Sequence, residues 1–171
     1  MKITTWNIKG LGSRRKHRNL SNKIKEEKPD IVFIQEIKCS VENVREKHRK
    51  WIKRYEYLEV KANKFFGGIL TLWDPQKFGM LDTEASRHHL SLISQLVGDR
   101  QCYMITNVYH PQPVEEKLRL ITTLEDMKKR YQALPWILRG DFNMIKSLTR
   151  RKGELEHLVG IQLPSRTFSP I

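Results

Sequence analysis

The run PDIVFIQEIK at residues 29–38 joins a strand signal to a candidate functional residue. Its part DIVFIQ (30–35) is rich in β-branched and aromatic side chains, which favour an extended backbone. The centre of the run is apolar at successive positions, as is typical of a strand that is buried on both faces. An acidic residue, Glu36, follows directly. The sequence therefore predicts an internal strand with a carboxylate at its carboxyl end.

Other segments extend this pattern into a mixed α/β domain. Further strand-like runs are KITTW (2–6), YEYLEV (55–60), GILTLW (68–73), LSLISQLV (90–97), CYMITNVY (102–109) and WILRG (136–140). Apolar residues at helical spacing predict helices over 14–27, 41–53 and 114–131. The stripe of the last helix is Val114, Leu118, Ile121, Leu124 and Tyr131. Strands that outnumber the helices indicate β-sheets packed face to face, with helices covering the outside.

Length and charge limit the class of protein. The chain has 171 residues, of which 39% are hydrophobic, so we expect one domain over residues 1–171. Its 32 basic and 19 acidic residues give a net charge of +13, which indicates a polyanionic partner. The longest uncharged apolar stretch, residues 65–73, is too short to span a bilayer, and the amino terminus lacks the apolar core of a signal peptide. We expect a protein that is neither membrane-bound nor secreted.

Sulfur chemistry is not indicated by the sequence. The two cysteines, Cys39 and Cys102, form no CxxC motif, and no clustered histidines could complete a zinc site. Both cysteines are therefore predicted to be small core residues in a reducing compartment.

Polar residues stand at the carboxyl ends of four strand-like runs. They are Asn7, Glu36, Tyr109 and Asp141, and Asn143 lies two positions beyond the last of them. Sheet folds assemble sites at such ends, because the strands fix positions while the loops can vary. Glu36 offers the oxygen ligands that Mg²⁺ prefers, and Asp141 could orient or deprotonate a water. The occurrence of all these polar residues at strand ends favours a functional site over unrelated turns and loops.

The remaining candidates supply hydrogen-bond donors. Asn7 and Asn143 could donate amide hydrogen bonds to phosphate oxygens without adding negative charge, and Tyr109 could donate its hydroxyl. Each candidate also has a structural interpretation. The segment RGDFN is typical of a turn capped by aspartate, Glu36 of a solvated loop, Asn7 of a turn and Tyr109 of an interface aromatic.

The basic run SRRKHR at residues 13–18 follows the first of these candidates. Its candidate DNA contacts are Arg14, Arg15, Lys16 and Arg18. These side chains could bind phosphates beside the site, but the run also fits the solvated start of a helix. Both interpretations stay open at this point.

Five motifs together resemble a known family. They are WNIKGLG (6–12), PDIVFIQEIK (29–38), GGILTLWD (67–74), NVYHP (107–111) and GDFNMI (140–145). In this order they resemble the endonuclease/exonuclease/phosphatase superfamily, and most of all the apurinic-type endonuclease domain of plant LINE (non-LTR) retrotransposons. The resemblance runs from Lys2 to the end of the chain, including LPSRTFSPI at 163–171.

The resemblance implies a four-layer α/β sandwich and Mg²⁺-dependent hydrolysis of a phosphodiester in DNA, with Mn²⁺ as the alternative ion. Carried over by motif, Asn7 and Glu36 would be metal-site residues and Tyr109 a phosphate contact. Asp141 would activate or orient the attacking water, and Asn143 would be a transition-state donor. We expect a monomer that acts in the nucleus or cytoplasm.

The sequence departs from the family pattern after Asp141. The family completes its site with a further Asp and a Ser-Asp-His segment, whereas this chain has no later Asp, and its only later histidine is His157. A smaller departure is Ile37, where these domains commonly have Thr. We therefore expect a domain that is incomplete at its carboxyl end and an impaired activity.

Three alternatives to an active endonuclease stay open. The chain could be a non-catalytic, nucleic-acid-binding remnant. It could use His88 or His89 as a substitute base, although adjacent histidines in a charged loop are usually only solvated. It could also be a phosphatase for small phosphorylated substrates, against which its net charge of +13 counts.

Overall fold

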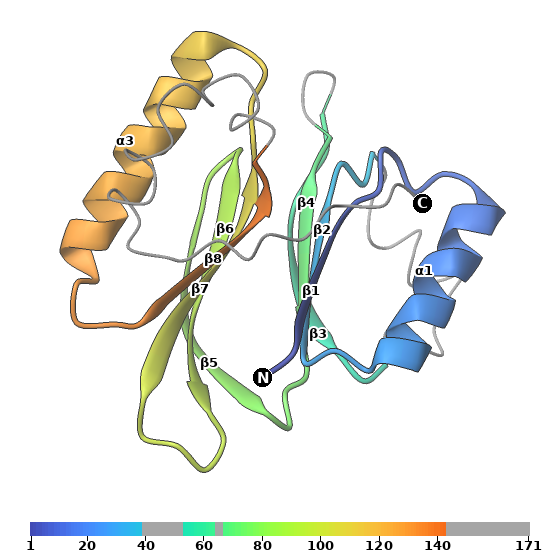
Figure 1. The fold of residues 1–171 in the computed structure, drawn as a ribbon, viewed down its shortest axis with the longest axis horizontal. Helices are drawn as coiled ribbons and strands as arrows, with labels where there is room; N and C mark the ends of the chain where they lie inside the picture. Colours follow the sequence, from blue (N-terminus) through green and yellow to red (C-terminus); the bar gives the residue numbers. More distant parts are fainter. Residues whose placement is uncertain (39–52, 64–66, 143–171) are drawn as a thin grey trace.

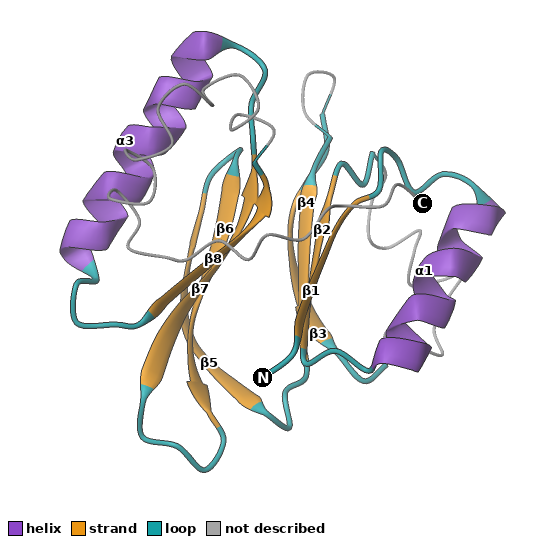
Figure 2. Cartoon of the chain, viewed as in Figure 1, coloured by secondary structure: helices purple, strands orange, loops and turns teal. Residues whose placement is uncertain are grey.

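Two four-stranded β-sheets pack face to face, and a helix covers the outer face of each (Figures 1 and 2). This arrangement is seen in a computed structural model that describes residues 1–38, 53–63 and 67–142. The four layers, in the order helix, sheet, sheet, helix, confirm the predicted α/β sandwich.

The first sheet has the strand order β1-β2-β4-β3. Its strands are β1 (Ile3–Asn7), β2 (Ile31–Gln35), β3 (Glu56–Val60) and β4 (Ile69–Trp73). The parallel pair β1 and β2 is joined by helix α1 (Arg14–Glu27), and the other pairs are antiparallel. A parallel pair needs such a crossover, and it leaves both carboxyl ends at the same edge of the sheet.

The second sheet has the order β5-β6-β7-β8. Its strands are β5 (Phe78–Ala85), β6 (His89–Leu96), β7 (Cys102–Tyr109) and β8 (Trp136–Asp141). Here β7 and β8 are the parallel pair, and helix α3 (Val114–Arg130) joins them. The carboxyl ends of β1, β2, β7 and β8 point to the same rim of the sandwich, at the top of Figure 1.

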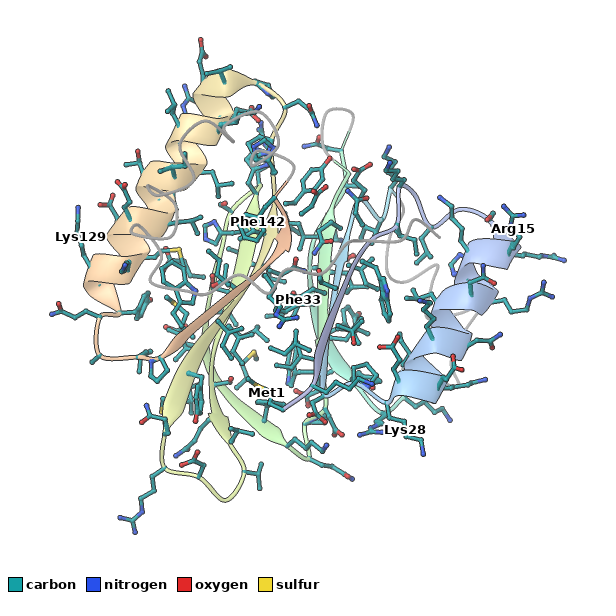
Figure 3. The ribbon with its side chains drawn as sticks, in the orientation of Figure 1. Met1, Arg15, Lys28, Phe33, Lys129 and Phe142 are labelled. Atoms are coloured by element: carbon teal, nitrogen blue, oxygen red, sulfur yellow. The ribbon has the colours of Figure 1, made fainter. Side chains whose placement is uncertain are left out.

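The core lies between the sheets and under each helix. Between the sheets, the first sheet contributes Ile31, Phe33 and Trp73, which pack against Leu92 and Ile105 of the second sheet. Figure 3 shows Phe33 between the two sheets. The other face of the first sheet is covered by the apolar side of α1. The strands β2 and β4 are therefore buried on both faces, which explains their continuous apolar sequences.

A polar contact crosses this core just below the rim. The side-chain amide of Gln35 donates a hydrogen bond of 2.6 Å to Oδ1 of Asn107. The amide of Asn107 in turn donates to the carbonyl oxygen of Leu70 and to Oγ1 of Thr71, at 3.1 and 3.2 Å. Because buried polar groups are costly unless paired, this network ties the end of β2 to β7.

Most predicted elements are confirmed, with three corrections. Strand β5 was not predicted, because its sequence FGMLDTEA is exposed at most positions and has few β-branched residues. Cys102 was expected in the core, but it is only half-buried at the start of β7. The helix predicted over 41–53 is not one of these corrections and remains a prediction, because it falls largely on residues 39–52, outside the described residues. Cys39 also lies outside them.

The third correction concerns the packed face of α3. The predicted stripe included Val114 and Leu118, but these side chains are 69% and 60% exposed, whereas Leu120 and Met127 are buried. Leu120 packs with Leu124 against the second sheet. Positions 120, 124 and 127 form an alternative stripe at the same helical spacing, so periodicity could not decide between the two.

No helix among the described residues has the length and apolar character needed to cross a membrane.

Buried histidines should make the stability depend on pH. Burial lowers the pKa of His89, which is 1% exposed, and the nearby Glu84 only partly opposes this. Between this lowered pKa and the ordinary value of about 6.5, the unfolded chain binds the extra proton. The free energy of unfolding should therefore fall as the pH drops below about 6.5. Urea unfolding at several pH values should show that the free energy of unfolding of His89→Gln depends less on pH than that of the wild type. The same dependence on pH in both proteins would contradict the role assigned to His89.

Candidate active site

Four residues predicted from the sequence lie at the rim. Asn7, Tyr109 and Asp141 are the last residues of β1, β7 and β8, and Glu36 directly follows β2. Tyr109 and Asp141 are partners in the parallel register of their sheet, as are Asn7 and Gln35 in theirs. Parallel pairing therefore places the two candidates of each sheet at the same edge of that sheet, and the hydrogen bond from Asn7 to Asp141 joins the two edges.

The amide of Asn7 joins acids from the two sheets. Its Nδ2 donates to Oε1 of Glu36 at 2.8 Å and to Oδ2 of Asp141 at 2.5 Å. Its Oδ1 accepts a hydrogen bond of 3.1 Å from the backbone N–H of Lys9. Two carboxylates require donors, so the amide nitrogen must face them. In this arrangement Asn7 orients both acids, and its predicted contact with a metal remains a prediction.

The backbone around Glu36 is held in an unusual conformation. Glu36 and Lys38 have φ angles of +55° and +51°, in the left-handed region that side chains rarely adopt. The carbonyl oxygen of Glu36 accepts from the N–H of Gly10 at 2.6 Å, and Lys38 donates to the carbonyl of Gly67 at 2.7 Å. A Cβ at Gly67 would lie 2.9 Å from Cα of Glu36, so this position requires glycine. Such strain persists where the surroundings fix it, often at functional sites.

The second oxygen of Glu36 has a cationic partner. Nζ of Lys38 lies 3.3 Å from Oε2, and the Glu36 side chain is 17% exposed while that of Lys38 is 57% exposed. Both oxygens of Glu36 are thus engaged, one by an amide and the other by an ammonium group.

The donor set suits a hard divalent cation. Glu36 and Asp141 approach the same amide, and Mg²⁺ typically takes one or two carboxylates together with waters and substrate phosphate oxygens. Within the described residues, no three His, Cys, Asp or Glu side chains gather closely enough to hold a metal ion by themselves. The two acids therefore fit an ion that keeps much of its coordination for water and substrate.

Tyr109 presents a protonated hydroxyl near these acids. Burial, reinforced by the carboxylates of Glu36 and Asp141, raises its pKa to about 12. The phenol is therefore a hydrogen-bond donor at neutral pH. The ring of His88 stacks on that of Tyr109, with 6.4 Å between centroids and an interplanar angle of 29°.

The histidines near the rim have different partners. Nε2 of His88 lies 2.9 Å from Oε2 of Glu116, whereas the buried His89 contacts Oγ of Ser86 through Nδ1 at 2.7 Å. Of the two, His88 lies beside a site residue, and its predicted use as a base remains a hypothesis.

His110 was not singled out from the sequence, although it directly follows Tyr109 in NVYHP. It is 4% exposed, and neither ring nitrogen has a hydrogen-bond partner in the described part of the chain. Its backbone N–H donates to the carbonyl of Asp141 at 3.1 Å. Burial lowers the pKa of His110, and the nearby Lys117 lowers it further. The imidazole is therefore uncharged at neutral pH.

The basic run forms the start of α1, as one interpretation predicted. Oγ of Ser13 caps the helix by accepting from the N–H of Lys16 at 3.3 Å. Arg14, Arg15 and Arg18 are exposed, and Figure 3 shows Arg15 pointing away from the sheets.

Lys16 differs from its neighbours. Its ammonium donates to the carbonyls of Ile8, Lys9 and Gly10 at 2.8, 2.9 and 3.1 Å. All its donors are used by the loop after β1, so Lys16 could attract a phosphate only through its net charge. Asn143, His157 and residues 163–171 lie outside the described residues.

The sequence of the chain is similar to a family of known proteins. A model of the Endonuclease/Exonuclease/phosphatase family matches residues 4–162. No curated protein sequence matches the chain.

Solved structures share the fold at low sequence identity. TDP2 from D. rerio, complexed with a single-strand DNA product, has a TM-score of 0.64 at 18% identity, covering 96% of this chain and 66% of that one. The human Nocturnin catalytic domain with bound sulfate has a TM-score of 0.61 at 14% identity, covering 84% and 64%. A mannosyl-6-phosphatase from Bacteroides thetaiotaomicron has a TM-score of 0.64 at 15% identity, covering 84% and 65%. The chain spans slightly less than two thirds of each of these structures.

Proposed function

Because the chain belongs to the endonuclease/exonuclease/phosphatase family, we propose that it hydrolyses phosphodiester bonds of DNA with the aid of Mg²⁺. The observation that carries this proposal is the bridge from Asn7 to Glu36 and Asp141, which joins acids of both sheets beside the hydroxyl of Tyr109. Mn²⁺ is the alternative ion, because it shares the preference for oxygen ligands.

Each residue at the rim has a role in this proposal. Glu36, oriented by Asn7, would hold the cation, which when bound supplies positive charge next to the reacting phosphate. Asp141 orients the attacking water and accepts its proton. The hydroxyl of Tyr109 donates a hydrogen bond to a non-bridging phosphate oxygen, and Asn143 is proposed as a second donor to the transition state.

Charge supports DNA as the substrate. The net charge of +13 favours a polyanion, and the exposed Arg14, Arg15 and Arg18 at the start of α1 could contact phosphates. A structural neighbour, TDP2, was solved with a DNA product. The five motifs resemble those of plant LINE endonucleases and so support a retrotransposon origin and action in the nucleus or cytoplasm. We also propose that the chain acts as a monomer.

A binding protein without catalysis is the second candidate. The family pattern has a further Asp and a Ser-Asp-His segment, and this sequence has no Asp after Asp141. We therefore propose that these 171 residues by themselves hydrolyse DNA more slowly than family members with the full set of residues. Complete loss of catalysis would leave the charge, and with it the affinity for DNA, unchanged.

Nicking of supercoiled plasmid tests the proposal. The purified chain should convert supercoiled to open-circular DNA in Mg²⁺, and EDTA should abolish this conversion because the charge stabilisation depends on the cation. A phosphomonoester such as p-nitrophenyl phosphate should be hydrolysed far more slowly, in contrast to a small-substrate phosphatase. Nicking that persists in EDTA would contradict the metal role. DNA binding without nicking, by protein shown to be folded by circular dichroism, would favour the binding candidate.

A further inference from the structure

The contact between Lys38 and Glu36 has a meaning beyond the proposed hydrolysis. Oε1 of Glu36 accepts a hydrogen bond from Asn7, so Oε2 is the carboxylate oxygen with more capacity for a cation. The ammonium of Lys38 lies at this oxygen, 3.3 Å away. A lysine side chain therefore stands where the donor set is best suited to a divalent ion.

The loop fixes the base of Lys38 but leaves its tip movable. Its backbone N–H is bonded to Gly67, and its φ of +51° matches the left-handed turn that begins at Glu36. A Cβ on Gly10 would lie 3.6 Å from Cδ of Lys38, so the aliphatic stem runs beside this glycine. The side chain is nevertheless 57% exposed, and a four-carbon stem lets the ammonium move through solvent.

We propose that Lys38 is a tethered counter-ion, which competes with the divalent cation for Oε2 of Glu36 and turns to the DNA phosphate when that cation binds. The inference rests on the proposed function, because it assumes that Glu36 holds the metal. Two cations beside one oxygen repel each other, so occupancy by the metal weakens the pair with Lys38. The released ammonium stays at the rim, where a phosphodiester is an alternative anionic partner.

Lys9 provides a matched control for Lys38. It belongs to the neighbouring loop after β1, is exposed, and has a φ of +47°. Among the described residues, Lys9 forms no ion pair with an acidic side chain, whereas Lys38 pairs with Glu36. Replacing either lysine by methionine removes one positive charge near the rim, but only Lys38→Met removes a contact with Glu36.

Binding of Mn²⁺ to the protein without DNA tests the inference directly. Isothermal titration or electron paramagnetic resonance should show that Lys38→Met lowers the Kd for Mn²⁺ by about two- to fivefold, as expected for loss of a partly exposed ion pair. Lys9→Met should change the Kd by clearly less. The difference should shrink at high salt, because screening weakens the competing pair. Glu36→Gln should weaken Mn²⁺ binding in either background.

The outcomes separate this inference from the proposed function. Equal Kd values for Lys38→Met and the wild type, or equal shifts for Lys38→Met and Lys9→Met, would overturn the counter-ion role while Glu36-dependent binding still supports the metal site. Mn²⁺ binding that is absent, or unaffected by Glu36→Gln, would overturn both. Lys38 is exposed, so its replacement should leave the circular dichroism spectrum unchanged and the comparison valid.

Discussion

Replacing Glu36 with alanine should lower metal-dependent nicking of supercoiled DNA by about two to three orders of magnitude. The variant loses the carboxylate that Asn7 orients and that would hold the cation, so charge on the reacting phosphate is no longer stabilised. Binding to DNA should change little, because its affinity depends on the total positive charge. Initial nicking rates in Mg²⁺ and binding measured over a range of salt concentrations would separate the two properties.

Glu115→Ala is the matched control for this variant. Glu115 is an exposed carboxylate in the first turn of α3, so its removal changes the net charge by the same amount. Nicking by Glu115→Ala should remain close to the wild-type rate. Wild-type nicking by Glu36→Ala would remove Glu36 from the proposed site, whatever the activity of the control.

Gly140→Ala should destabilise the fold more than other single substitutions near the rim. Gly140 has a φ of +150°, and a Cβ there would lie 1.9 Å from the carbonyl oxygen of Val108. Val108 is its register partner in the parallel pair of β7 and β8, so the clash cannot be relieved without separating the strands. We expect the free energy of unfolding to fall by about 3–5 kcal/mol, a size that requires a backbone or packing defect.

Urea unfolding of Gly140→Ala beside Gly12→Ala would check this expectation. A Cβ on Gly12 meets nothing within 4 Å, so its replacement should change the free energy of unfolding by about 0.5 kcal/mol or less. The same transition midpoint for both variants would show that β8 can shift to accept a side chain. Because Asp141 follows Gly140, the same shift would also move the proposed water-orienting carboxylate.

The sequence predicted the positions of buried strands more easily than it predicted which face of a helix packs against a sheet. β2 and β4 are apolar throughout because both their faces are covered, and this signal is visible locally. β5 lies at the sheet edge with most side chains in water, so hydrophobicity does not mark it. The face of α3 depends on where the helix lies on the second sheet, and the helix period alone does not contain that information.

The candidate residues could be located from the sequence, but their mutual contacts could not. The positions at strand ends were enough to expect that the side chains of Asn7, Glu36 and Asp141 lie close to one another. The direction of the Asn7 amide depends on the two carboxylates that it contacts, and the pair of Lys38 with Glu36 lies in a loop with two left-handed residues. Local propensity disfavours that conformation for glutamate and lysine, so only the tertiary contacts reveal it.

The hydrogen bond between Asn7 and Asp141 also bears on how the chain folds. It connects residues 134 positions apart, so its formation requires a long loop to close. Contacts so distant in sequence slow folding compared with local turns. During refolding, helices and single hairpins can therefore form before the two acids meet. Recovery of catalysis would then report completion of the native topology, whereas recovery of secondary structure would not.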